Sequence, residues 1–191
     1  MLSEKEIEFK NLLTKEEFDL LVAYFNLKPS DFTLQTNYYF DTADHYFKKQ
    51  KIGFRLRVLP DSNELTLKIP LKPHVMEEKT ELITNEERDA IIQHLNFPSL
   101  PFLEKWPDRG SLKCIGSMET LRTKIELENG NLFLDHSFYS QMEDFEVEYE
   151  STDVENGKKF FLHFLKKHNI PIRHTDKKIA RLMKHINTLK G

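Results

Sequence analysis

Side chains of unlike character alternate along much of this chain, and a period of two residues is typical of β-strands with two different faces. Near the N-terminus, Glu6, Glu8 and Lys10 fall on one face, while Ile7 and Phe9 fall on the other. The alternation predicts eight strands, at residues 4–10, 35–41, 53–59, 64–70, 75–83, 119–128, 131–138 and 144–151. The chain is therefore expected to form a fold dominated by sheet.

Turn and helix signals separate these strands. Residues 60–63 and the pair Asn129-Gly130 favour tight hairpins, which make neighbouring strands antiparallel. Residues 98–116, which contain three prolines, are expected to be irregular. The helix signals are capping boxes at Thr14–Glu17 and Thr84–Glu87 and apolar stripes at 160–165 and 179–186. Because the sequence has neither a repeat nor a linker, we expect one α+β domain over residues 1–191.

The polar faces of the predicted strands are almost purely ionisable, and the two signs of charge are segregated. One alternating strand by itself usually means only that one face of a sheet is in water. A surface that served only solubility would, however, mix the two signs. The acidic faces carry Glu4, Glu6, Glu8, Glu146, Glu148 and Glu150, and the basic faces carry Arg55, Arg57, Lys68, Arg122 and Lys124.

Eight antiparallel strands can close into a barrel, which leaves no exposed sheet edge. The apolar faces would then point outward beneath the amphipathic helices, and the ionisable faces would line the interior. Enclosed charges are costly to leave without partners. Arg and Lys side chains would bind a polyanion, and carboxylates would bind hard divalent cations that bridge to phosphate. We therefore expect a closed eight-stranded antiparallel barrel with helices on the outside.

The segment Glu6-Ile7-Glu8-Phe9-Lys10 resembles the ExExK motif that opens the CYTH domain family, also called triphosphate tunnel metalloenzymes. Later blocks follow in the order that this family has, so the resemblance covers nearly the whole chain. These blocks are residues 35–42, 55–57, 65–68, 122–124, Asp135 and 146–150. The family includes thiamine triphosphatases, inorganic triphosphatases, RNA triphosphatases and class IV adenylate cyclases.

The resemblance implies a triphosphate site with Mg²⁺ or Mn²⁺, and it assigns roles to residues of this chain. By position, the metal ligands would be Glu6, Glu8, Glu146, Glu148 and Glu150. The phosphate ligands would be Lys10, Arg55, Arg57, Lys68, Arg122, Lys124 and Lys178, with Lys10, Glu8 and Glu148 central to catalysis. Further candidates are Glu81, Asp135, Tyr39 and Asp41. The chain departs from the family pattern at Asn37, where an acid is frequent, and at Lys177, where serine is usual.

From these features we predict metal-dependent hydrolysis of the terminal phosphoanhydride bond of a small-molecule triphosphate. One alternative is an adenylate cyclase that converts ATP to cyclic AMP and pyrophosphate, although the sequence has no nucleobase signature. Another is a non-catalytic module that binds polyphosphate or a nucleotide. A barrel that carries an apolar ligand fits poorly with the charged inner faces.

The composition limits the classes of binding partner and the cellular compartment that are expected for this chain. The formal net charge of −3 argues against a general nucleic-acid or membrane-surface binder, which would have a basic excess. No apolar run has transmembrane length, and Cys114 is the only cysteine. We therefore expect a cytoplasmic protein, for which the sequence specifies no oligomeric state.

Overall fold

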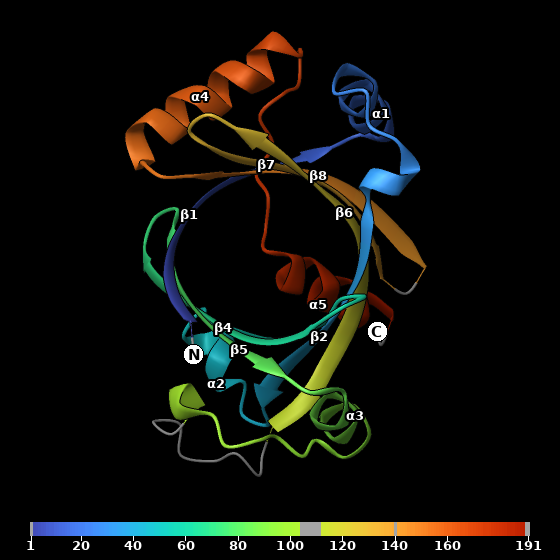
Figure 1. The fold of residues 1–191 in the computed structure, drawn as a ribbon, viewed down its shortest axis with the longest axis vertical. Coiled ribbons are helices and arrows are strands. Elements are labelled where there is room, and N and C mark those ends of the chain that lie inside the picture. The colour runs from blue at the N-terminus through green and yellow to red at the C-terminus, as the bar shows by residue number, and fades with distance from the viewer. Residues whose placement is uncertain (1, 104–111, 140, 190–191) are drawn as a thin grey trace.

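The computed structural model describes residues 2–103, 112–139 and 141–189, and its strands form a closed barrel (Figure 1). Around the barrel the strands follow the order β1-β5-β4-β3-β2-β6-β7-β8, and each neighbouring pair is antiparallel. Their bounds are β1 (Leu2–Leu13), β2 (Thr33–Thr42), β3 (Gly53–Val58), β4 (Asn63–Lys72), β5 (Val75–Ile83), β6 (Leu112–Leu127), β7 (Gly130–Tyr139) and β8 (Met142–Ser151). This architecture confirms the predicted closed barrel of eight antiparallel strands.

The helices begin where the capping signals predict. In both capping boxes the threonine side chain accepts a hydrogen bond from a backbone amide three residues later, Thr14 from Glu17 and Thr84 from Glu87. The α-helices are α1 (Lys15–Tyr24), α2 (Tyr46–Lys49), α3 (Asn85–His94), α4 (Val154–Lys167) and α5 (Lys178–Leu189). Two short 3₁₀ turns, η1 (Pro29–Asp31) and η2 (Pro101–Leu103), complete the described helical elements. None of the helices in the described residues is long and apolar enough to cross a membrane.

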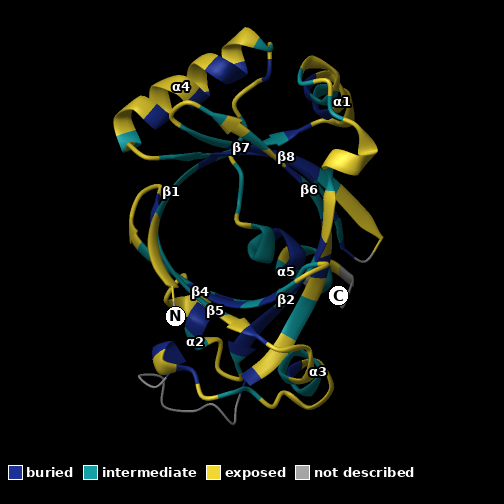
Figure 2. Cartoon of the chain, viewed as in Figure 1, coloured by how far each residue is buried: buried dark blue, intermediate teal, exposed yellow. Residues whose placement is uncertain are grey.

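Helices pack on two sides of the barrel, and each side has its own apolar core. Helices α1 and α4 cover β1, β7 and β8 through a core that includes Phe18, Val147 and Phe161. On the opposite side, α2, α3 and η2 cover β2 to β5. Figure 2 shows that α4 is buried on the side facing the barrel and exposed on the other. The outward-facing apolar rows of the strands are therefore covered, as the alternation predicts.

Helix α5 lies across the barrel opening instead of covering an outer face (Figure 1). Leu182 of α5 packs against Tyr39, Met118 and Tyr139 from three strands. A side chain at Gly116 would meet Leu182 at about 3.0 Å, so glycine permits this close approach of α5 to β6. The N-terminus of α5 is thereby held at the lumen.

Two local features differ from the sequence-based expectation. Of residues 98–116, which were expected to be irregular, 112–116 form the start of β6, while 104–111 lie outside the described residues. The four-residue helix α2 was not predicted, because a single turn is too short to show helical periodicity.

Candidate metal and phosphate site in the barrel lumen

The strand register decides which side chains face the lumen, because residues directly opposite each other in an antiparallel pair point to the same side. Lys10 lies opposite Glu148, and Arg57 lies opposite Asn37. Rows of this kind enclose a cavity of about 160 Å³. The predicted site residues that line it are Glu6, Glu8, Lys10, Tyr39, Arg55, Arg57, Lys68, Arg122, Glu148, Glu150 and Lys178.

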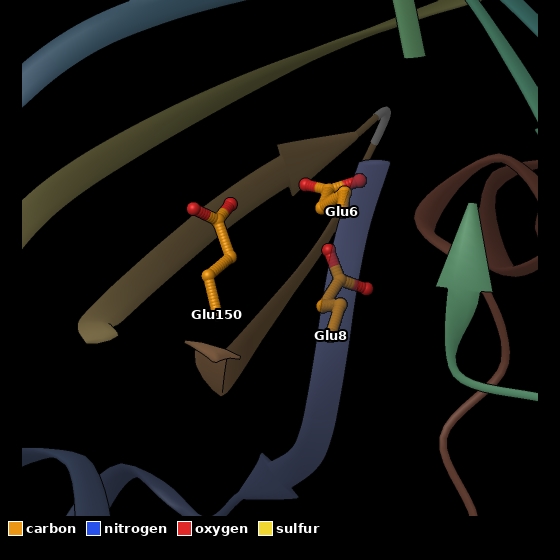
Figure 3. A group of neighbouring side chains, drawn as sticks. All are labelled: Glu6, Glu8 and Glu150. Atoms are coloured by element: carbon orange, nitrogen blue, oxygen red, sulfur yellow. The ribbon is translucent and has the colours of Figure 1, made fainter. Parts of the chain in front are cut away.

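A first carboxylate group consists of Glu6 and Glu8 on β1 and Glu150 on β8 (Figure 3). One oxygen from each lies within 4.8 Å of the others. Burial and the neighbouring Glu6 carboxylate raise the pKa of Glu150 to about 8. Lys68 pairs with Glu6 at 2.6 Å, and Lys10 pairs with Glu8. The group remains short of positive charge, and its oxygen ligands fit a divalent cation such as Mg²⁺.

A second carboxylate group consists of Asp135, Glu146 and Glu148, which are at most 3% exposed. Although burial opposes ionisation, Lys178, Lys10 and Arg122 hold the pKa of Glu148 well below its usual range. Glu146 and Asp135 do not line the cavity itself and lie behind the residues that do. This group therefore already has cationic partners from the protein.

The basic residues of the lumen include an arginine that is only partly neutralised. Arg57 Nε donates a hydrogen bond to Asn37 Oδ1 at 3.2 Å, and its closest carboxylate, Glu64, is 3.8 Å away. Burial, followed by repulsion from Arg55 and Arg122, lowers the pKa of Arg57 to about 10. Three guanidinium groups close to one another favour an anion with several negative oxygens, such as a polyphosphate.

The chain matches the family model for the CYTH domain over residues 4–183. The chain belongs to the CYTH domain family. Among known proteins, it is 36% identical over 185 residues to a Bacillus subtilis (strain 168) protein named "Putative triphosphatase YjbK", and 95% of each chain is covered. This membership confirms the resemblance that the ExExK segment indicates.

Two solved structures have the same fold as this CYTH chain. A Bacillus halodurans protein, described as a putative adenylate cyclase, is 34% identical, with a TM-score of 0.90 over 95% of this chain and 98% of the other. A Hippeastrum protein is 23% identical, with a TM-score of 0.70 over 95% and 96% of the two chains. The latter is described as a putative adenylyl cyclase that reveals a dominant triphosphatase activity, and at this identity the likeness concerns the fold.

Besides Asp135 and Glu146, three candidates of this CYTH domain do not line the cavity. Lys124 has a side chain that is 49% exposed and pairs with Glu126. Asp41 accepts hydrogen bonds from the backbone amides of Phe47 and Lys48, so it stabilises the first turn of α2. Glu81 lies opposite Leu65 and therefore faces the outer core instead of the lumen. The structure therefore places these three side chains outside the lining of the cavity.

Glu78, not Glu81, is the acid that β5 contributes to the lumen. It pairs with Lys68 at 2.8 Å and with Arg55 at 3.5 Å, and despite its burial these cations lower its pKa to about 2. Strand β5 carries ionisable residues on both faces, so alternation alone could not choose between them. Other lining residues that were not among the candidates are Gln35, Asn37, Gly53, Met76, Lys177 and Ile179.

Proposed function

We propose that this CYTH chain hydrolyses the terminal phosphoanhydride bond of a small-molecule triphosphate and that it uses Mg²⁺ or Mn²⁺. The observation that carries the proposal is the presence, in one cavity, of a cation-deficient carboxylate group and of Arg57, a buried arginine that is only partly neutralised and lies near Arg55 and Arg122. A triphosphate with a divalent ion satisfies both. The YjbK relative, named for a triphosphatase, supports hydrolysis as the reaction.

In this proposal the lumen residues divide the work of phosphoryl transfer, which depends mainly on positioning and charge neutralisation. Arg55, Arg57 and Arg122 bind phosphate oxygens, and Lys68 contributes a further positive charge near the first carboxylate group. Glu6, Glu8 and Glu150 hold the divalent ion, which would supply Lewis-acid polarisation and a more acidic bound water. Lys10, between Glu8 and Glu148, orients the Glu8 carboxylate.

Adenylate cyclase activity is the second candidate, because the Bacillus halodurans relative is described as a putative adenylate cyclase. The cavity volume favours hydrolysis. At about 160 Å³ the cavity is smaller than the roughly 300–1,000 Å³ of typical small-molecule pockets, and α5 lies across one opening. It suits a compact anion better than a triphosphate with an enclosed adenosine.

Turnover of tripolyphosphate, thiamine triphosphate and ATP, each with Mg²⁺ and with Mn²⁺, tests the proposal. Release of orthophosphate that depends on the metal supports hydrolysis. Formation of cyclic AMP and pyrophosphate from ATP would instead assign a cyclase. Tight triphosphate binding without turnover would identify a non-catalytic module.

Arg57→Ala is expected to raise KM for the triphosphate by about tenfold or more, because a charge-assisted contact to phosphate contributes roughly 1.5–3 kcal/mol. Lys124→Ala is the matched control, since Lys124 is half-exposed and lies away from the cavity. It should leave KM within about twofold of the wild-type value, given how little exposed ion pairs contribute. Steady-state kinetics measure both. Equal effects of the two substitutions would contradict the phosphate assignment.

The free energy of unfolding should depend on pH, because the first carboxylate group has too few cations near it to keep all of its carboxyls ionised. The pKa of Glu150 is about 8 in the folded, metal-free chain, against an ordinary value of 4.5. The folded state therefore retains a proton that the unfolded state releases, and the free energy of unfolding falls as pH rises from about 4.5 to about 8.

Glu150→Gln should remove this dependence and raise the free energy of unfolding at pH 8 by on the order of 2 kcal/mol. Urea unfolding of the metal-free protein at a series of pH values checks this expectation. Glu126→Gln, at an 80% exposed side chain, is the control. A wild-type profile that stays flat between these pH values would contradict it.

We also propose that residues 1–191 form a single CYTH domain that acts in the cytoplasm on small molecules instead of nucleic acids. The match to the family over residues 4–183 supports the first point. The single cysteine and the formal net charge of −3 support the others.

A further inference from the structure

Lys178, the first residue of α5, inserts its ammonium group into the second carboxylate group. Its Nζ lies 2.8 Å from Asp135, 2.8 Å from Glu146 and 2.6 Å from Glu148. The side chain is only 12% exposed. One cation therefore contacts all three carboxylates, which is the position that a divalent ion bound to this group would take.

Other cations of the protein complete the neutralisation of this group. Arg122 forms a two-pronged contact with Asp135, at 2.7 and 2.6 Å, and also contacts Glu148. Arg181 donates a hydrogen bond to Glu146 at 2.7 Å. Among the described residues, the carboxylates of Asp135, Asp144, Glu146 and Glu148 face Arg122, Lys178 and Arg181, and they share Lys10 with Glu8.

The first carboxylate group lacks such a balance. Lys68 divides its contacts between Glu6 and Glu78, and Lys10 divides its contacts between Glu8 and the second group. One oxygen from each of Glu6, Glu8 and Glu150 lies within 4.8 Å of the others, so these carboxylates repel one another. A divalent ion would relieve repulsion at the first group, whereas at the second it would enter a buried site whose three carboxylates already contact Lys178 and two arginines.

The start of α5 is fixed by contacts on both sides of Lys178. Before it, the backbone amide of Arg173 donates to Asn11 Oδ1 at 2.7 Å, and the Leu12 amide donates to Thr175 Oγ1 at 2.9 Å. After it, Arg181 pairs with Asp144 at 2.8 Å and Leu182 is buried against the barrel. The chain thus anchors the lysine where its ammonium meets the three carboxylates.

We propose that the Lys178 ammonium is a built-in cation that takes the place of a second metal ion, so that this chain binds divalent metal only at Glu6, Glu8 and Glu150. The inference deepens the proposed function, since it concerns the metal content of the same lumen. It gives Glu146 and Glu148 the role of lysine partners, in place of the metal-binding role expected from position, and it directs Lys178 to them instead of to phosphate.

Counting bound Mn²⁺ without any substrate tests the proposal. Electron paramagnetic resonance of the free ion during titration should give one Mn²⁺ per wild-type chain and one more in Lys178→Met. The double variant Lys178→Met with Glu146→Gln should lose the additional ion, because it removes one ligand. Two ions in the wild-type chain, or no gain in Lys178→Met, would overturn the proposal.

A second substitution, together with circular dichroism of each variant, serves as the control for misfolding. Lys178→Gln removes the charge but keeps hydrogen-bond donors for the carboxylates, so it should also gain one Mn²⁺ if Lys178→Met does not fold. The count needs no turnover. If these variants gain an ion but the wild-type chain hydrolyses no triphosphate, the proposed function is wrong and this inference stands. If the wild-type chain hydrolyses a triphosphate but the variants gain no ion, this inference is wrong and the proposed function stands.

Discussion

Glu8→Gln is expected to lower kcat/KM for the triphosphate by about a thousandfold. Glu8 contributes a carboxylate to the first group and also pairs with Lys10. The substitution removes the charge of a proposed metal ligand and takes from Lys10 the nearest of its carboxylate partners. Since metal coordination supplies several kcal/mol of charge stabilisation, and each ~1.4 kcal/mol is a factor of ten, an effect of this size follows.

The matched control for this substitution is Glu81→Gln, on the outer face of β5. Both changes replace one partly buried carboxylate by an amide, but only Glu8 reaches the lumen. Steady-state kinetics with saturating Mg²⁺ or Mn²⁺ should separate the two variants by at least about a hundredfold, and Glu8→Gln should also weaken Mn²⁺ binding. Near-normal turnover in Glu8→Gln would refute the assignment of the metal site.

Glu148→Gln should cause the largest loss of stability, about 3–5 kcal/mol. The Glu148 carboxylate is 3% exposed and pairs with Lys10, Lys178 and Arg122. An amide in its place leaves three cations close together with one negative charge fewer. For a chain of this size the loss corresponds to a fall in Tm of roughly 6–20 °C, which thermal and urea unfolding would measure.

A double-mutant cycle makes this prediction specific to the ion pairs. Adding Lys178→Met to Glu148→Gln removes one of the excess cations, so the double variant should lose clearly less stability than the sum of the two single variants. Glu126→Gln, at an exposed site, should stay within about 0.5 kcal/mol of wild type. Additive losses would argue that Glu148 acts through packing instead of charge.

The two carboxylate groups have similar chemistry but different surroundings, and this difference decides their roles. Each contains three acids within 4.8 Å of one another. One is matched by lysine and arginine, while the other retains a carboxyl whose pKa is raised to about 8. A cation from solution is therefore expected at the first carboxylate group, formed by Glu6, Glu8 and Glu150.

Alternation along the sequence determined most of the fold and the side of the sheet on which most charges lie. Side chains in a strand point to opposite faces by covalent geometry, so Glu6, Glu8 and Lys10 had to share a face, as did Arg55 and Arg57. The segregation of signs then indicated an enclosed polyanion and metal. Capping boxes placed the starts of α1 and α3 for an equally local reason.

Only the tertiary structure decided which charges meet. Strand β5 is ionisable on both faces, and its pairing with β4 places Glu78 inside and Glu81 outside. The position of Lys124 along the barrel leaves it in solvent, although it shares a face with Arg122. Closure of the barrel and the seating of α5 beside Gly116 bring Lys178 to acids more than 25 residues away in the sequence. Such contacts depend on register and packing between distant segments, which a local pattern does not contain.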